Sequence, residues 1–298
     1  MNTILIKQIL FRLVTASILV SLPAFVDAES DAAESSIGET IPRLIEQFSR
    51  SSGIFVPELQ PEDIEVLVAG KSIISLSGKP GLEPKGGVEA VGLLGLQLVN
   101  APRLLVWLTV LGGGGRSDDR FTNVVLSRMP GGAHARYQHV NLPWPIRDRH
   151  WVIFCEKNLE LADASAGVIW EHRWSLHNTG EHLLKTAYED GRISGLKMST
   201  LDDSIYVPVN RGSWAVFDLG QNRTLILAFY DADLGGRLPA RLVRSITKRQ
   251  LRKYLEATRK LTEQILQYYD GNSPIHDGFG LPISRKAALD AALAWAKP

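Results

Sequence analysis

One long amphipathic helix near the C-terminus constrains the fold more than any other feature of this sequence. It is predicted over residues 238–269, with Pro239 in its first turn and Asp270 to Pro274 ending it. At 1.5 Å per residue it would be about 45 Å long if it stayed straight. Its apolar stripe needs a partner surface and includes Leu238, Leu242, Ile246, Leu251, Leu255, Ile265 and Tyr268. We therefore expect the helix to lie on a sheet.

The rest of this helix is basic, with Arg241, Arg244, Lys248, Arg249, Arg252 and Lys253 on its other faces. Solvation explains such a face, and a transient contact with an anionic membrane is the alternative.

Strand-like segments precede the helix and supply the sheet. They are predicted at residues 71–77, 87–99, 121–129, 133–142, 149–161, 167–177, 205–209, 213–219 and 223–231. Short helices are predicted from Thr40, over 61–69, over 101–111 and over 287–295. This order indicates an α+β fold in which a curved antiparallel sheet is wrapped around the C-terminal helix.

The first 28 residues are typical of a cleaved signal peptide. Lys7 and Arg12 supply positive charge, residues 13–26 are apolar or small, and Val26-Asp27-Ala28 has the small-x-small form of a cleavage site. An uncleaved anchor is the alternative. We expect an exported protein, periplasmic or secreted, and soluble after cleavage.

Composition narrows the classes of function. Lys plus Arg is 33 and Asp plus Glu is 32, so no charge excess points to nucleic acid. The single cysteine, Cys155, excludes an internal disulfide and a zinc site built on several cysteines. Neither a metal nor a cofactor is expected.

Residues 167–177 show how one strand divides its faces. Val168, Trp170, His172, Trp174 and Leu176 alternate with a more polar set, so they form the inner face. The tryptophans either line a cavity or fill a core. His172 either anchors a polar group of a ligand or bonds to an internal neighbour, and the second is the commoner case.

Two segments resemble the START (StAR-related lipid-transfer) domain family. The first is Leu142-Pro-Trp-Pro-Ile-Arg-Asp-Arg-His-Trp-Val152. The second joins Gly212-Ser-Trp214 to Thr224-Leu-Ile-Leu-Ala-Phe-Tyr-Asp231, the Asp233-Leu-Gly-Gly-Arg-Leu-Pro239 loop and the long helix. His150 and Leu234 depart from the residues common in the family.

The resemblance implies a helix-grip fold enclosing a hydrophobic cavity for one lipid, sterol or similar molecule. The resemblance covers a START-like lipid-binding domain (59–270). The other predicted segments are a signal peptide (1–28), an acidic segment with a helix (29–58) and a tail with a short Ala-rich helix (271–298). The predicted ligand-binding residues are Arg149, Trp170, His172, Trp174, Tyr230, Leu238, Leu242 and Ile246.

Arg149 has two interpretations, because a buried guanidinium needs a partner in either case. It binds a ligand head group, or it forms a structural ion pair for which Asp231 and Asp233 are the candidates.

No catalytic motif stands out. There is no Gly-x-Ser-x-Gly elbow, and Gly112 to Gly115 lacks the Lys-Ser/Thr of a phosphate-binding loop. We therefore expect a carrier of a hydrophobic molecule and not an enzyme. A cyclase- or aromatase-like enzyme using the same cavity is the alternative, and a module with a filled cavity that recruits a partner is a third.

Overall fold

The computed structural model describes residues 26–77, 91–112, 121–142, 144–193, 198–236, 240–269 and 275–296. The chain divides into two compact units, Met1–Ser36 and Ile37–Pro298. The sheet, the long helix and the tail helix all belong to the second unit, which is the subject of the following paragraphs.

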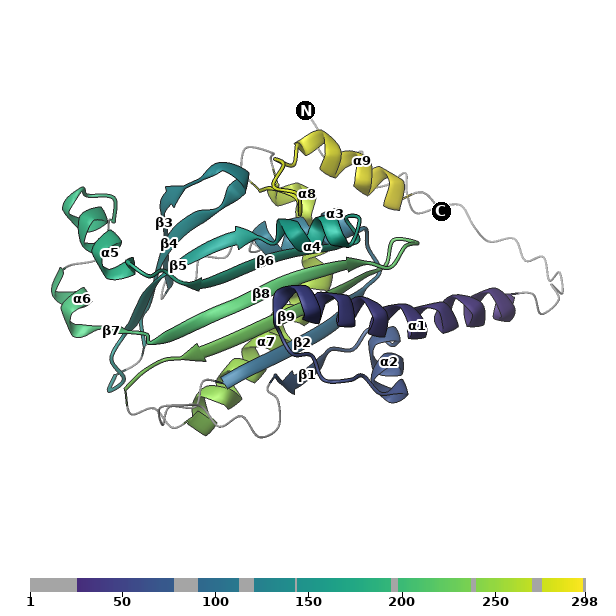
Figure 1. The fold of residues 1–298 in the computed structure, drawn as a ribbon, viewed down its shortest axis with the longest axis horizontal. Helices are drawn as coiled ribbons and strands as arrows, with labels where there is room; N and C mark the ends of the chain where they lie inside the picture. The colour runs from purple at the N-terminus through teal and green to yellow at the C-terminus, as the bar shows by residue number, and fades with distance from the viewer. Residues whose placement is uncertain are drawn as a thin grey trace, which may run out of the picture. The chain divides into compact units, whose positions relative to one another are not determined.

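Nine strands form a single sheet over the described residues, in the order β1-β2-β9-β8-β6-β5-β4-β3, with β7 paired to β5 (Figure 1). Neighbours in this order are antiparallel, and only the β5–β7 pair is parallel. The strands are β1 (Ile73–Leu76), β2 (Val91–Val99), β3 (Phe121–Arg128), β4 (His134–Val140), β5 (Arg149–Lys157), β6 (Ile169–Leu176), β7 (Ile205–Tyr206), β8 (Val209–Asp218) and β9 (Thr224–Asp233).

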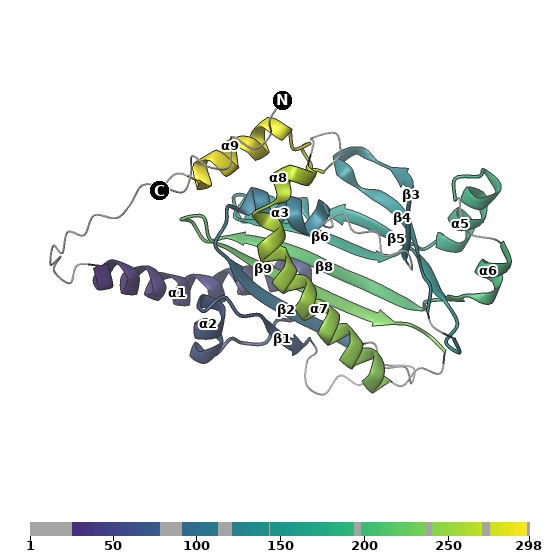
Figure 2. The ribbon, with the colours of Figure 1, turned by 180° about the vertical axis from the view of Figure 1, so that it is seen from behind.

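Helices lie on both faces of this sheet. They are α1 (Val26–Ser52), α2 (Pro61–Val68), α3 (Arg103–Gly112), α4 (Leu159–Ala164), α5 (Gly180–Glu189), α6 (Met198–Asp203), α7 (Ala240–Thr262), α8 (Ile265–Tyr268) and α9 (Arg285–Trp295), with a 3-10 turn, η2 (Pro130–Gly132). Helix α7 crosses one face, which we call the α7 face (Figure 2). Residues 37–52 of α1 and helix α2 cover the other face at β2, β8 and β9.

The α7 face is closely packed where the helix meets β2. A Cβ atom on Gly95 would lie 2.8 Å from Cδ1 of Leu255 and 3.0 Å from Cδ2 of Leu251. Glycine at this position therefore lets the helix approach the strand, and both leucines are buried. The predicted α+β fold is confirmed: a large antiparallel sheet with a C-terminal helix packed across one face, as in a helix grip.

Two boundary predictions were wrong for local reasons. Helix α1 begins at Val26, so Thr40 does not cap it and Pro42 lies inside it; the Ala- and Glu-rich segment before Thr40 favours helix. The predicted long helix ends at Thr262 and α8 follows. The hydroxyls of Thr258 and Thr262 each donate to the carbonyl four residues earlier, a bond that competes with regular helix.

Three further helices were not predicted, and the strand predicted at 149–161 ends at Lys157 because α4 begins at Leu159. Helices α4, α5 and α6 fill the connections around β6, and α5 packs its Leu184 and Ala187 against β3, β4 and β5 on the face away from α7. The predicted strands at 205–209 and 213–219 are divided differently, because β8 already begins at Val209.

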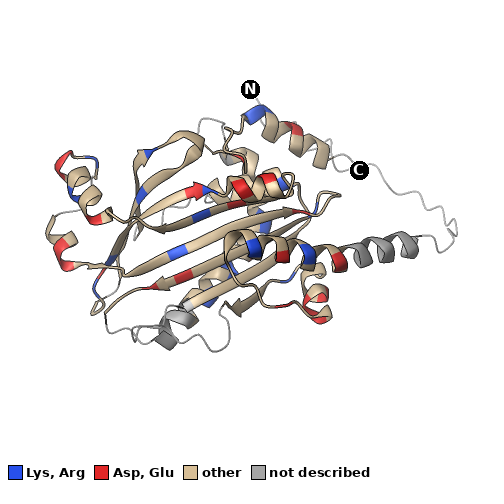
Figure 3. Cartoon of the chain, in the orientation of Figure 1, with Lys and Arg blue, Asp and Glu red and all other residues tan. Residues whose placement is uncertain are grey.

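The tail helix α9 docks through its alanine side. Ser284 caps it by accepting from the Ala287 N–H, and Ala288 is buried in the same core as α3. No described helix is long and apolar enough to cross a membrane. Lys and Arg lie among Asp and Glu on the strands shown in Figure 3, whereas α2 carries the acidic residues Glu62, Asp63 and Glu65. Helix α7 is mainly basic, with Lys248, Arg249, Arg252, Lys253, Arg259 and Lys260 against Glu256.

Candidate binding site on the α7 face

The candidate site is a continuous row of side chains across β4, β5, β6, β8 and β9. Strand register places His134 beside Cys155, Cys155 beside Trp174, Trp174 beside Gly212 and Gly212 beside Tyr230. A second row runs from Lys157 through His172 to Trp214. Because side chains two apart on a strand share a face, both rows lie on the α7 face.

One end of this surface is basic, and we call it the basic patch: His134, Arg136, Lys157 and His172. The Nζ atom of Lys157 lies 3.2 Å from Nδ1 of His172. The rings of His134 and His172 are stacked, with centroids 6.1 Å apart. The ammonium of Lys157 also lies 5.2 Å from the centre of the Trp107 ring, which is a cation–π distance.

Desolvation sets the charges in the basic patch. The pKa of Lys157 is lowered to about 8, chiefly by desolvation and also by Arg136, while Cys155 and Asp277 partly offset these effects. Desolvation lowers the pKa of His134 to about 4 and lowers the pKa of His172 well below its usual value. At neutral pH both imidazoles are therefore neutral, and Lys157 and Arg136 carry the charge.

This charge has no ionic partner among the described residues. Lys157 is 9% exposed and forms no ion pair with a described carboxylate, and the same holds for Arg136. The Nε atom of Arg136 and the Nε2 atom of His134 are buried without a hydrogen-bond partner. Asp277 is the nearby acidic residue, and its Oδ1 accepts from the N–H groups of Phe279 and Leu281.

The other end is aromatic, and we call it the aromatic patch: Trp174, Trp214, Tyr230 and Tyr254. Tyr230 makes edge contacts with Trp174 and Trp214, at centroid distances of 5.3 and 5.7 Å. Tyr254 from α7 lies against Trp214 at 4.8 Å. The Nε1–H of Trp174 donates to Oδ1 of Asn210 over 3.0 Å, which fixes the ring across β8.

Gly212 allows Trp174 to lie across β8. A Cβ atom at Gly212 would overlap the Trp174 ring and lie 2.5 Å from the carbonyl oxygen of Phe229. We expect Gly212→Ala to lower the free energy of unfolding by about 2–3 kcal/mol, because the ring and a strand must both move. Urea unfolding measures the loss. Gly38→Ala is the control, because nothing lies within 4 Å of its added Cβ and no loss of stability is expected. Equal losses in both variants would contradict the role of Gly212 in making room for Trp174.

Trp170 occupies the packed end of this face. It is 7% exposed, and its ring lies 5.7 Å from that of Trp107 and under the guanidinium of Arg103. A Cβ atom at Gly278 would overlap it. The structure therefore surrounds Trp170 with protein, whereas Trp174 and Tyr230 keep part of their surface accessible. Ligand binding by these residues stays a prediction.

Arg149 bonds to backbone carbonyls instead of carboxylates. It is 2% exposed, donates from Nε to the carbonyl of Leu234 over 2.7 Å and from Nη2 to that of Gly235 over 3.1 Å, and also donates to Arg147. The predicted ion pair was wrong: Asp231 pairs with Arg211 at 2.6 Å, and Asp233 accepts from the N–H of Gly235. The reason is geometric, since the turn after β9 brings its carbonyls to the guanidinium.

The remaining predicted residues belong to the start of the long helix. Leu238 lies outside the described residues. The backbone of Leu242 and Ile246 lies in α7, and their side chains are outside the described part. The loop after Gly112 lies outside it as well.

His172 has the internal neighbour predicted for it, but its identity as Lys157 was missed. So were Arg136 and His134. One signal was available: Lys157 ends a strand whose same-face residues, Ile153 and Cys155, are apolar. For β4 the hydropathy pattern indicates the wrong inner face. Ala135 and Tyr137 form the more apolar face of this strand, but α5 covers that face, on the side away from α7.

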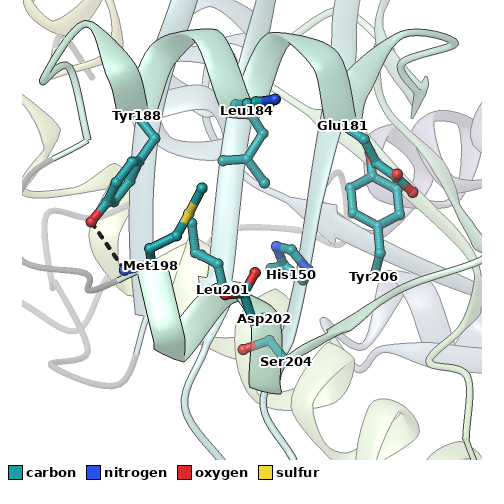
Figure 4. A pocket seen from close by; sticks show the side chains of 10 residues that line it. His150, Glu181, Leu184, Tyr188, Met198, Leu201, Asp202, Ser204 and Tyr206 are labelled. Carbon is teal, nitrogen blue, oxygen red and sulfur yellow. Dashed lines mark hydrogen bonds between the residues drawn. The ribbon is translucent and has the colours of Figure 1, made fainter.

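Other pockets open on described residues away from these patches. One lies between α5, α6, β5 and β7, has a volume of about 270 Å³, and is lined by Leu184, Met198, Leu201, Tyr206 and His150 among others (Figure 4). His150 is 7% exposed, and desolvation lowers its pKa to about 4. A second, of about 420 Å³, lies beside Trp144 and Thr200.

Ser204, His139 and Asp148 meet near this region without forming a catalytic triad. The Ser204 hydroxyl lies 3.4 Å and the Asp148 carboxylate 3.3 Å from the same atom, Nε2 of His139. A proton relay needs the acid and the hydroxyl on different ring nitrogens. Among the described residues, no group of His, Cys, Asp and Glu could hold a metal ion.

Comparisons with known proteins identify structures of similar fold only. No family model and no curated protein sequence matches the chain. Human StAR-related lipid transfer protein 5 is 15% identical, with a TM-score of 0.47 over 78% of this chain and 98% of its own. A STAR-related lipid transfer protein fragment from Xanthomonas axonopodis is 15% identical, with a TM-score of 0.44 over 64% of this chain and 99% of its own.

An aromatase/cyclase, Zhui from Streptomyces sp. R1128, is 16% identical, with a TM-score of 0.30 over 58% of this chain and 87% of its own. At these scores the likenesses add nothing about the chemistry of this chain, so the functional argument depends on its own residues.

Proposed function

We propose that this protein binds a single hydrophobic molecule on the α7 face, over the aromatic patch and with its polar end at the basic patch. Burial of apolar ligand surface would supply most of the affinity, at roughly 25 cal/mol per Å². The polar end would fix the orientation.

The observation that carries the proposal is the mixed environment of His172 and Tyr230. Desolvation dominates both shifts, lowering the pKa of His172 and raising that of Tyr230 well above its usual value. Neither side chain is fully buried, however. Side chains that are removed from bulk water and yet keep accessible surface are expected to border an internal space.

Packing limits where this space can lie. Leu251 and Leu255 fill the contact between α7 and β2 at Gly95, and Trp170 is enclosed beneath Gly278. The ligand is therefore proposed to lie beside the helix, over β4, β5, β6 and β8, and not directly beneath it.

We also propose that the protein acts outside the cytoplasm after removal of residues 1–28. Small-x-small chemistry at Val26 to Ala28 supports this proposal. Transport of the ligand between membranes would be one use of such a carrier.

Native mass spectrometry of the protein purified from its own host tests both proposals. We expect a fraction of the protein to carry one hydrophobic molecule, released on denaturation, and the chain mass to correspond to a start at Glu29. A preparation that is uniformly free of ligand, and that takes up none of a mixed lipid extract, would contradict binding. A mass that includes residues 1–28 would contradict cleavage.

One observation favours the enzymatic alternative, a cyclase- or aromatase-like activity on a hydrophobic substrate. Catalysis by acid and base needs two titratable groups close together, and Lys157 and His172 are 3.2 Å apart. The described carboxylate near this pair is Asp277, which forms no ion pair with Lys157 and whose Oδ1 accepts from the N–H groups of Phe279 and Leu281. Loss of turnover in His172→Ala with ligand affinity retained would decide for the enzyme.

A further inference from the structure

The basic patch carries more positive charge than the described residues around it neutralise. Lys157 and Arg136 face the same space from β5 and β4, and Lys157 bonds only to the neutral ring of His172. Burial of a charged group without a partner is costly, so such groups normally pair or meet a ligand. Here the partner is not among the described residues.

The free hydrogen-bonding atoms define what would fit. A protonated Lys157 has only donors, so Nδ1 of His172 accepts one of its protons and the other two remain. Arg136 adds a buried N–H at Nε without a partner. His134 donates through Nδ1 to the carbonyl of Gly132, over 3.0 Å, which leaves Nε2 as an unpaired acceptor.

We propose that the hydrophobic ligand carries an anionic oxygen-acid head group, a carboxylate or a phosphate ester, bound by Lys157 and Arg136 with its apolar chain over Trp174 and Tyr230. This inference rests on the proposed function and names the chemical class of its ligand. An ionised oxygen acid accepts several charge-assisted hydrogen bonds at once. A hydroxyl retained on the head group would donate to Nε2 of His134.

Other head groups fit the patch less well. A neutral alcohol or sterol hydroxyl would leave Lys157 and Arg136 without a counter-charge, and a quaternary ammonium would be repelled by them. Asp277 raises the pKa of Lys157, but it forms no ion pair with Lys157 or Arg136, and its Oδ1 accepts from the N–H groups of Phe279 and Leu281.

The test compares amphiphiles that differ only in the head group. Dodecanoate, dodecyl phosphate and dodecanol are titrated into the delipidated full chain at pH 7, with inorganic phosphate as a head group without a chain. We expect both anions to bind at least about tenfold more tightly than dodecanol, and inorganic phosphate to bind far more weakly than dodecyl phosphate. The stronger of the two anions distinguishes a carboxylate from a phosphate ligand.

The matched variants remove one positive charge from either face of the sheet. Lys157→Met takes it from the basic patch, and Arg173→Met takes it from the opposite face, where Arg173 pairs with Glu156 at 2.8 Å. We expect Lys157→Met to lose the preference for anions over dodecanol and Arg173→Met to keep it. Because Lys157 is buried without an ionic partner, the unfolding midpoint of Lys157→Met is expected to stay unchanged or to rise.

The outcomes separate the two proposals. Equal affinity of the wild type for dodecanoate and dodecanol would overturn the anionic head group and leave hydrophobic binding intact. Failure of all three amphiphiles to bind would overturn the proposed function itself. An anion preference retained in a folded Lys157→Met protein would also overturn the assignment of Lys157 to the anionic head group. If that variant does not fold, the comparison of dodecanoate with dodecanol on the wild type decides whether the ligand is anionic.

Discussion

Replacing Glu171 with alanine is expected to lower the free energy of unfolding by about 3–5 kcal/mol, because it removes a buried charge to which other buried groups bond. Glu171 is 1% exposed on β6, on the face away from His172. Its Oε1 accepts from the Ser213 hydroxyl over 2.6 Å and its Oε2 from the Asn158 amide over 2.7 Å. Asn158 in turn caps α4 by accepting from the Leu161 N–H.

Two variants control this measurement, which is made by urea unfolding. Glu156→Ala removes a carboxylate from the neighbouring strand, but its ion pair with Arg173 is partly exposed, so the loss should stay below about 1 kcal/mol. Glu171→Gln keeps the shape and one acceptor, so its loss should fall between the two. If Glu171→Ala were as stable as Glu156→Ala, the hydrogen bonds of Glu171 with Ser213 and Asn158 would contribute little to the free energy of unfolding.

The pH dependence of Glu171 follows from its environment. Desolvation raises the pKa of Glu171, and hydrogen bonds from Ser213 and Asn158 only partly offset this. A carboxyl group with a raised pKa in the folded state binds its proton more readily there than in the unfolded chain. Its contribution to stability therefore falls as pH rises from the unfolded value, about 4.3, through the folded value. Glu171→Gln should remove this dependence.

Affinity for dodecanoate is expected to decrease above pH 8, by up to about tenfold for each pH unit. Lys157 has a pKa of about 8 in the free protein, so its ammonium is present below that pH and lost above it. A bound carboxylate favours the ammonium form, which gives the sign of the effect. Titration calorimetry from pH 6 to pH 9.5 measures it, because the carboxylate of the ligand stays ionised over this range.

Five other titratable groups among the described residues face Lys157: His134, Arg136, Cys155, His172 and Asp277. From β4, His134 stays neutral because its pKa is about 4, and Arg136 stays charged. His172 from β6 is neutral because desolvation lowers its pKa, and burial raises the pKa of Cys155 to about 11. Asp277 faces Lys157 from the segment before α9. Dodecanol and the Lys157→Met variant should show no decrease, and a decrease in either would assign the effect to another group.

Local pattern predicted the elements well where one face of each is buried. The alternation at Trp170, His172 and Trp174 placed these side chains on one face of β6, as the structure has them. The apolar stripe of the long helix predicted its packing on the sheet, and Leu251 and Leu255 make that contact. Such periodicity depends only on residues close together in the chain, so a single sequence is enough to predict it.

The break after Thr262 and the earlier start of α1 were not predicted, because propensity and capping patterns are weak at element ends. The pairing of Arg149 with carbonyls of the turn after β9 was missed for a different reason. These groups are far apart in the chain, and only the fold of that turn decides which oxygen atoms reach the guanidinium.

By itself the sequence determined the fold class, the order of the strands, the long C-terminal helix and the inner face of β6, but not the helices α4, α5 and α6. Only the tertiary structure decided which polar groups share that face. Lys157 meets His172, and His134 meets Cys155, through the register of β4, β5 and β6, which sets neighbours across strands independently of their distance along the chain. Helix α5 covers the more apolar face of β4, and the polar side chains of that strand therefore lie beside His172 inside the molecule.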